Sequence, residues 1–108
     1  MFTDSKKFEP KIPDAPRLSD LESTLEKRKT TYGSFFKISA TSQRLKNALI
    51  HTSQFQHLEV SKKESIEMIL HKIARIVHGD PEYLDNWHDI AGYATLIEKE
   101  INEICKNQ

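Results

Sequence analysis

The chain has 108 residues, and its 16 basic and 16 acidic side chains cancel to a formal net charge of zero. This length fits one small domain, and the balanced charge provides no overall field that would attract nucleic acid or an anionic membrane. No apolar run approaches the roughly 20 residues that a membrane-spanning helix needs. Cys105 is the only cysteine, which excludes an internal disulfide and a cysteine-based zinc site.

Residues 1–17 are predicted to form a flexible N-terminal arm. Pro10, Pro13 and Pro16 each remove a backbone donor, and their regular spacing disfavours both helix and sheet. The segment also carries charges where a secretory signal peptide needs an apolar stretch. We therefore expect one helical domain over residues 18–108, in a cytoplasmic protein.

Two helices are predicted in the first half of this domain. Ser19 and Glu22 have the spacing of a capping box at the start of the first helix, and Gly33 ends it. The second helix is expected over about residues 34–52. Its apolar residues recur at helical spacing on one side, and they are Phe35, Ile38, Leu45, Ala48 and Leu49.

The third helix shows the strongest helical pattern. Ser61 and Glu64 form a second capping box at its start. Apolar residues then follow at spacings of three and four, and they are Ile66, Ile69, Leu70, Ile73, Ile76 and Val77. We expect Gly79 to end the helix in a left-handed conformation, and Pro81 to block its continuation.

The fourth helix is predicted to begin at Asp85, acting as its N-cap. Its apolar stripe consists of Ile90, Ala94, Ile97, Ile101 and Ile104. No stretch alternates with the period of two that strands require, so we predict an all-α fold with a C-terminal antiparallel helix hairpin. The apolar residues of the last two helices extend beyond one seam. We therefore expect a homodimer in which two hairpins pair as a four-helix bundle.

Charged residues gather on both helices next to the hairpin turn. Arg75 lies four residues before Gly79, and Asp89 lies four residues after Asp85. An antiparallel hairpin is therefore predicted to place Arg75 beside Asp89. Lys72 lies one turn from Arg75 on the same side of its helix, and Asp85 and Asp89 share a side in the same way.

Two interpretations of these charges are open from the sequence. In the structural one, Arg75 and Asp89 form an ion pair that holds the register of the hairpin. In the functional one, Lys72 and Arg75 face a cleft and bind a phosphate-containing ligand. Asp85, Asp89, His88 and Tyr93 would complete this ligand-binding set, the last two by contributing hydrogen bonds and stacking.

Gly92 and Trp87 are interpreted structurally. A glycine in the middle of a helix costs about 0.5 to 1 kcal/mol relative to alanine, so we expect a neighbouring helix to approach closely at Gly92. Trp87 is expected in the core rather than as a stacking platform. The histidines lack the metal-binding spacing of two residues at i and i+4 around a carboxylate. No nucleophile context occurs either, so we predict neither a metal site nor catalytic residues.

The stretch KIARIVHGDPEYLDNWHDIAGYATLIEK, with the upstream RKTTYGSF and ESIEMI, resembles a family of small bacteriophage and prophage proteins. These are described as MazG-like, meaning similar to the all-α nucleoside triphosphate pyrophosphohydrolases. The resemblance covers about residues 28–99. It implies a four-helix arrangement built by oligomerisation, a nucleotide ligand, and a location in the bacterial host cytoplasm.

The resemblance to the enzymes themselves is partial. They carry a Glu-Glu-x-x-Glu cluster on one helix and a Glu-x-x-Asp pair on the next, which together bind magnesium. Here Asp85 and Asp89 are spaced by four residues, and Lys72 and Arg75 stand where the enzymes have carboxylates. We expect a nucleotide- or phosphate-binding protein without efficient hydrolysis, with magnesium as a cofactor only if pyrophosphohydrolase activity is present. The alternative is a phage accessory, anti-defence protein that binds a host immune factor or sequesters a host nucleotide signal.

Overall fold

The computed structural model describes residues 18–106, and the predicted arm over residues 1–17 lies outside them. Its helices are α1 (Leu18–Tyr32), α2 (Phe35–Ile50), α3 (Ser53–Gln56), α4 (Val60–His78) and α5 (Leu84–Lys106). No strand occurs among these residues, so the predicted all-α fold is confirmed. None of the described helices is long and apolar enough to cross a lipid bilayer.

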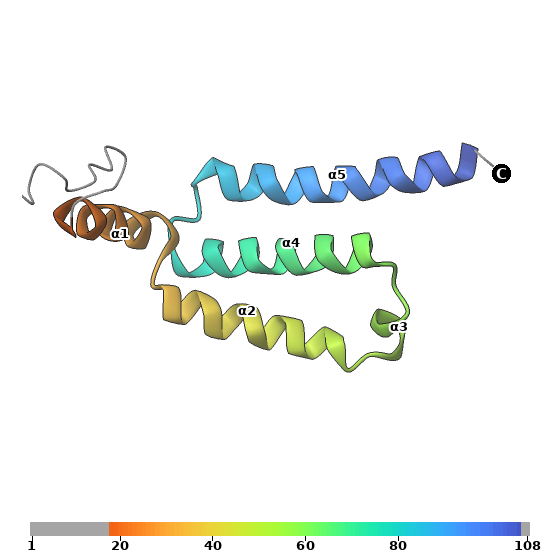
Figure 1. Cartoon of the computed structure of the whole chain (residues 1–108), viewed down its shortest axis with the longest axis horizontal. Coiled ribbons are helices and arrows are strands. Elements are labelled where there is room, and N and C mark those ends of the chain that lie inside the picture. Colours follow the sequence, from red (N-terminus) through yellow and green to blue (C-terminus); the bar gives the residue numbers. More distant parts are fainter. Residues whose placement is uncertain (1–17, 107–108) are drawn as a thin grey trace, which may run out of the picture.

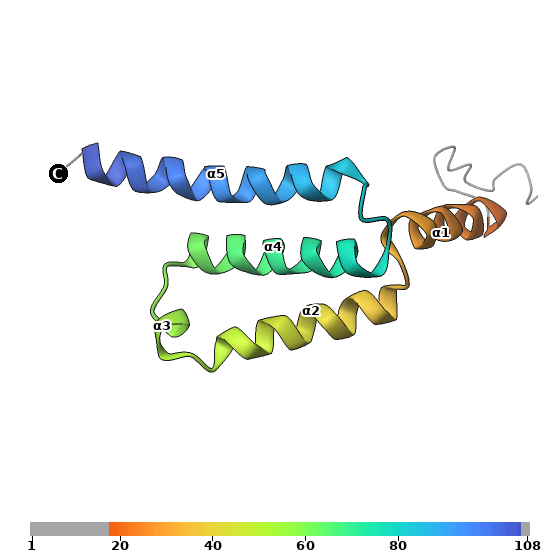
Figure 2. The same ribbon diagram turned by 180° about the vertical axis from the view of Figure 1, so that it is seen from behind.

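The three long helices α2, α4 and α5 lie side by side in a single antiparallel layer, with α4 in the middle (Figures 1 and 2). The helix α4 packs against both α2 and α5, which confirms the predicted C-terminal hairpin. The helix α1 projects from the end of the layer at which α2 begins (Figure 1). Apart from the contact of α1 near one end, neighbouring helices flank α4 on two sides only, so the layer has two broad surfaces.

The hydrophobic core of this layer is small. Within residues 19–106, the buried apolar side chains are Ile38, Phe55, Ala74 and Ile76. Two of them come from α4, whose apolar residues follow the predicted spacing of three and four. The core therefore consists of two seams, one on each side of α4.

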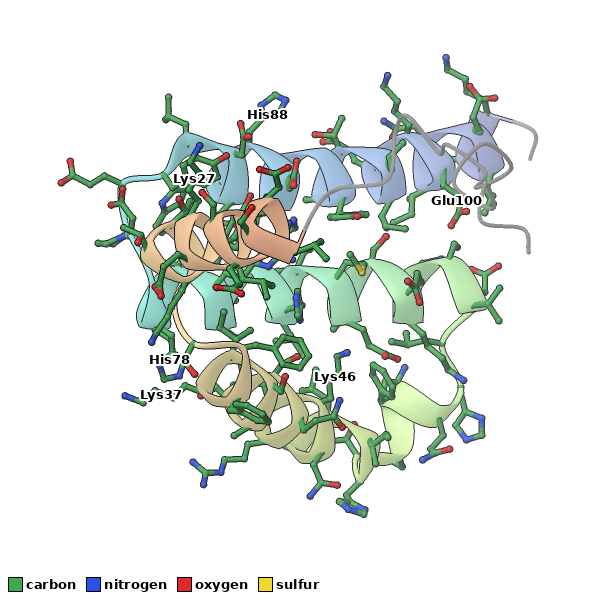
Figure 3. All side chains as sticks on the ribbon, turned by 60° about the vertical axis from the view of Figure 1, so that its left-hand side comes forward. Lys27, Lys37, Lys46, His78, His88 and Glu100 are labelled. Atoms are coloured by element: carbon green, nitrogen blue, oxygen red, sulfur yellow. The ribbon has the colours of Figure 1, made fainter. Side chains whose placement is uncertain are left out.

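Polar contacts cross the seam between α2 and α4. The Thr41 hydroxyl lies 2.6 Å from Nε2 of His78. Further along, Lys46 Nζ lies 4.0 Å from the Glu67 carboxylate. Figure 3 shows Lys46 between these two helices and His78 at the far end of α4. These contacts set the alignment of α2 against α4 in the middle and at one end.

The short helix α3 was not predicted. It contributes Phe55, which is buried, and the Gln56 side-chain amide donates a hydrogen bond of 2.7 Å to the Ile50 carbonyl oxygen. A helix of one turn has no apolar repeat, so periodicity could not indicate it.

The predicted helix starts are wrong at three places. The helix α1 begins at Leu18, so Ser19 lies inside it, and α5 begins at Leu84, so Asp85 lies in its first turn instead of at the N-cap. The N-cap of α4 is Glu59, and the Ser61 hydroxyl donates to the Glu100 carboxylate of α5 at 2.8 Å. A side chain that finds a partner on another helix is no longer available to cap its own.

Two glycines allow the α1–α2 turn to touch the α4–α5 turn. Gly33 has a φ of +91°, and a Cβ there would lie 1.9 Å from the His78 carbonyl oxygen. Gly79 has a φ of −128°, so the predicted left-handed conformation is wrong. A Cβ at Gly79 would instead lie 2.4 Å from the Tyr32 carbonyl carbon. The two turns therefore meet backbone to backbone.

A hydrogen bond stabilises the contact between the two turns. The Asp80 N–H donates to the Thr31 carbonyl oxygen at 2.8 Å. Residues of the RKTTYGSF segment and of the hairpin turn, which are far apart in the sequence, thus lie together at one end of the layer. This end of the molecule carries the candidate site.

Candidate functional site

The charges of the hairpin pair differently from the prediction. Lys72 Nζ lies 2.9 Å from the Asp89 carboxylate, and this hydrogen bond is the main cause that lowers the pKa of Asp89. Among residues 18–106, no ion pair joins Arg75 to Asp89, so the predicted partner is wrong. Counting outward from the turn assumed that both helices end at the same height. The observed pair shows that they are offset by about one turn.

Arg75 reaches a different partner, the Tyr32 ring at the end of α1. Its guanidinium carbon lies 4.5 Å from the ring centroid, and that of Arg28 lies 5.3 Å from the same centroid. Tyr32 also packs edge to face on Tyr83, with ring centroids 5.4 Å apart. Tyr32 first, and then Asp85, raise the pKa of Tyr83 to about 12. The Tyr32 ring thus contacts two cations, Arg28 from α1 and Arg75 from α4.

A cavity of about 410 Å³ lies at this junction of α1, α2 and α4. Its charged and aromatic lining residues are Arg28, Lys29, Tyr32, Phe35, Phe36, His71 and Arg75. No acidic residue of the described chain lines it. We call this hollow the cationic cavity.

The positive charge of the cationic cavity is not neutralised by the described part of the protein. Neither Arg28, Lys29 nor Arg75 has a carboxylate of residues 18–106 within ion-pair distance. By contrast, Lys46 and Lys72 each pair with a carboxylate on the neighbouring helix. Arginines usually find such partners when they are available, so an anionic group from outside the chain suits this cavity.

His71 lines the same cavity from α4. Its partial burial is the largest cause that lowers its pKa, followed by the positive charges of Arg75, Lys46 and Lys72. The imidazole is therefore held neutral at neutral pH. A neutral imidazole offers one donor and one acceptor to a ligand.

The remaining predicted site residues lie on α5. The Asp85 carboxylate accepts a hydrogen bond of 3.1 Å from the Tyr83 hydroxyl. A second, open hollow of about 510 Å³ is lined by His88, Asp89, Ala91, Gly92, Tyr93, Thr95 and Leu96. His88 points outward from α5, away from α4 (Figure 3). Of the predicted set, only Arg75 lines the cationic cavity.

Two structural expectations for α5 are also wrong. A Cβ placed at Gly92 meets no described atom within 4 Å, so none of the described helices approaches there. Trp87 is 51% exposed, and its indole N–H donates to the Pro81 carbonyl oxygen at 2.8 Å. Its ring therefore lies over the hairpin turn and outside the core.

The residues that the sequence analysis missed are those contributed by α1 and the start of α2, together with His71 of α4. Arg28, Lys29 and Tyr32 belong to the RKTTYGSF segment, whose place in the resemblance was the one available signal. Their proximity to Arg75 is a tertiary contact that no local pattern encodes. No group of His, Cys, Asp and Glu residues in the described chain is arranged to hold a metal ion.

Comparison with known proteins identifies a family but not an activity. No curated protein and no solved structure matches the chain. Residues 18–101 match a family described as Domain of unknown function (DUF6378). The match extends from the first residue of α1 into the last turns of α5, and it includes every residue of the cationic cavity. The chain therefore belongs to the DUF6378 family.

Proposed function

We propose that the protein binds a small phosphate-bearing molecule of the nucleotide class in the cationic cavity. The observation that carries this proposal is the group of three cations, Arg28, Lys29 and Arg75, around one cavity with no carboxylate of the described chain to pair with. Guanidinium groups bind phosphate oxygens through two parallel hydrogen bonds. Such a ligand would supply the negative charge that the three cations of the cavity lack.

The shape and lining of the cavity support a ligand with an aromatic part. Its volume of about 410 Å³ falls within the range of roughly 300 to 1,000 Å³ typical of small-molecule sites. Phe35 and Phe36 line it and are largely exposed, so their faces are available for stacking with a base. Contact with Tyr83 and the two guanidinium groups holds the Tyr32 ring in place, which lowers the entropic cost of binding.

The proposal concerns binding and includes no reaction. A magnesium-dependent pyrophosphohydrolase uses carboxylates over the phosphates, whereas the described lining of this cavity supplies cations. The resemblance to MazG-like phage proteins and the cytoplasmic location expected from the sequence both suit a nucleotide ligand.

The first test compares phosphorylated and unphosphorylated compounds without magnesium. Nucleoside mono-, di- and triphosphates should raise the melting temperature and bind in calorimetry, whereas the corresponding nucleosides should bind weakly or not at all. Arg28→Ala should weaken nucleotide binding about tenfold to hundredfold, since a charge-assisted hydrogen bond contributes about 1.5 to 3 kcal/mol.

Lys27→Ala is the matched control for Arg28→Ala. Lys27 is the preceding residue on the same helix, it is exposed, and it does not line the cavity, so its loss removes the same charge without removing a ligand contact. We expect this variant to keep the parent affinity. The proposal is refuted if no phosphorylated compound binds the parent protein, or if the two variants lose affinity equally.

A further inference from the structure

A continuous apolar surface covers the side of the hairpin opposite the cationic cavity. On α4, Ile66, Ile73 and Val77 lie seven and four residues apart and therefore share one side. His71 and Arg75, which line the cavity, are each two residues from Ile73, a rotation of roughly 200° around the helix. The apolar side of α4 thus faces away from the proposed ligand.

On α5, Trp87, Ala94 and Ile101 lie at intervals of seven residues and likewise share one side. Lys72 and Asp89 join the two helices, and the buried Ile76 and Asn86, four and three residues from them, mark the seam. Successive residues are rotated by roughly 100° around a helix axis. The paired Lys72 and Asp89 therefore lie roughly 40° from Ile76 and roughly 60° from Asn86, both toward the same face of the layer. The apolar residues fall roughly 60° to 100° to the other side.

The apolar sides of α4 and α5 therefore join into one surface, on the face of the layer away from the Lys72–Asp89 pair. We call it the apolar face, and it consists of Ile66, Ile73, Val77, Trp87, Ala94 and Ile101.

The exposed area of this face matches what a stable dimer needs. Its largest contributors are Ile73, Val77, Trp87 and Ile101, which are 36%, 62%, 51% and 43% exposed. Together they present roughly 400 Å² of apolar surface. A standard interface buries about 800 Å² per partner, of which a little more than half is apolar. These four side chains alone supply most of that amount.

The spacing of the apolar residues indicates a helical partner. The set on α4 is Ile66, Ile69, Leu70, Ile73, Ile76 and Val77, which gives three apolar positions in each heptad. A helix with this pattern buries its stripe against two neighbours, as in a four-helix bundle, whereas a single seam needs two positions per heptad. The helices α5 and α2 cover the two flanks of this stripe, whereas Ile73 and Val77 in its middle stay exposed and are available to a further helix.

We propose that the apolar face binds a second copy of this chain, so that two α4–α5 hairpins form a four-helix bundle about a two-fold axis. A second copy carries the same stripe of the same width, which makes the face self-complementary. The two cationic cavities then lie on the outer surfaces of the dimer. This inference does not depend on the ligand proposed for the cavity.

The test is the mass of the protein in solution, measured by light scattering and sedimentation at micromolar concentrations. The parent should be a dimer. Ile73→Glu and Ile101→Glu should each raise the dimer dissociation constant by at least about a hundredfold, because a carboxylate buried against an apolar surface is strongly unfavourable. Circular dichroism should show parent-like helix content in both variants, because both positions are partly exposed in the single chain.

Leu96→Glu is the matched control. Leu96 is 61% exposed on the same helix, but it lies on the flank of α5 that carries Asp89. This variant should remain dimeric. Trp87 is the only tryptophan, so its fluorescence reports on the face directly and should shift to shorter wavelength as the parent concentration rises.

Three results would overturn the inference. The first is a parent protein that stays monomeric, which would leave the face to a different protein. The second is a dimer that persists in folded Ile73→Glu and Ile101→Glu. The third is equal disruption by Leu96→Glu.

Discussion

Lys72 and Arg75 are one turn apart on α4, yet their side chains have different partners. The lysine ammonium is a compact point charge and pairs with Asp89 across the hairpin. The planar guanidinium of Arg75 can also stack on an aromatic face, and it lies over Tyr32. The hairpin register places Lys72 beside Asp89 and Arg75 beside Tyr32, and the shape of each cation suits the partner that it meets.

A double-mutant cycle tests this assignment. Lys72→Ala should lower the free energy of unfolding in the parent and lower it less in an Asp89→Asn background, since the partner is then already lost. The cycle between Arg75→Ala and Asp89→Asn should show no coupling. Chemical denaturation measures both cycles. A coupling between Arg75 and Asp89, without one between Lys72 and Asp89, would support the register predicted from the sequence instead. Lys72→Ala should also leave nucleotide affinity unchanged.

His71 links stability to pH. Its folded-state pKa is lowered below the ordinary 6.5, mainly by burial, so the unfolded chain binds a proton that the folded chain does not. Stability should therefore fall as the pH falls through 6.5 and level off below the folded-state pKa. His71→Gln should reduce this loss, as measured by melting temperature across the range.

The control for that prediction is His51→Gln, which replaces an exposed histidine at the end of α2 and should leave the pH dependence as in the parent. An unchanged slope in His71→Gln would show that another group causes the loss of stability.

At the scale of the elements, each side of α4 contacts a different part of the molecule or is exposed. One side carries His71 and Arg75 to the cationic cavity, and the opposite side carries Ile73 and Val77 to the apolar face. The remaining two sides pack against α2 and α5. A helix in the middle of a single layer can serve two separate surfaces because its neighbours leave both of them uncovered.

The glycines provide a contrast between two elements. Gly92→Ala should raise the free energy of unfolding by about 0.5 to 1 kcal/mol, because the position is helical and its added Cβ meets no neighbour. Gly33→Ala should lower it by more than about 1 to 2 kcal/mol, because the backbone has a positive φ and the Cβ would overlap the His78 carbonyl.

Thermal and chemical unfolding of the two variants provide the measurement. A loss of stability in Gly92→Ala would contradict the prediction and would mean that another molecule packs closely on that side of α5.

The whole molecule has little core for its exposed apolar surface. The buried apolar side chains of residues 19–106 number four, whereas thirteen large apolar residues of the same range are exposed. Folding stability comes mainly from apolar burial, so covering these exposed side chains would add to the stability of the single chain. A second copy on the apolar face would bury much of that surface.

A dimer coupled to folding makes the melting temperature depend on concentration. The parent melting temperature should rise measurably with each tenfold increase in protein concentration, because the partner binds the folded chain and not the unfolded one. Calorimetry over two decades of concentration provides the measurement. Ile101→Glu should melt at a lower temperature that is independent of concentration, and a concentration-independent parent would argue against a coupled dimer.

The sequence by itself determined the elements whose signals are local. The apolar spacing of three and four predicted α4 and most of α5, and Gly79 with Pro81 marked the turn between them. Together with the absence of strand-like alternation, these signals predicted the all-α fold and the antiparallel hairpin. Such signals work because helix periodicity and chain breaks depend on residues within one or two turns of each other.

Only the tertiary structure decided which residues form the candidate site. The hairpin register selected Lys72 as the partner of Asp89, and the contact between the Gly33 and Gly79 turns brought Tyr32 to Arg75. The Ser61 hydroxyl likewise donates to Glu100 of α5 instead of capping α4. These choices depend on the free energy of contacts between residues from 17 to more than 40 positions apart, to which local patterns are insensitive.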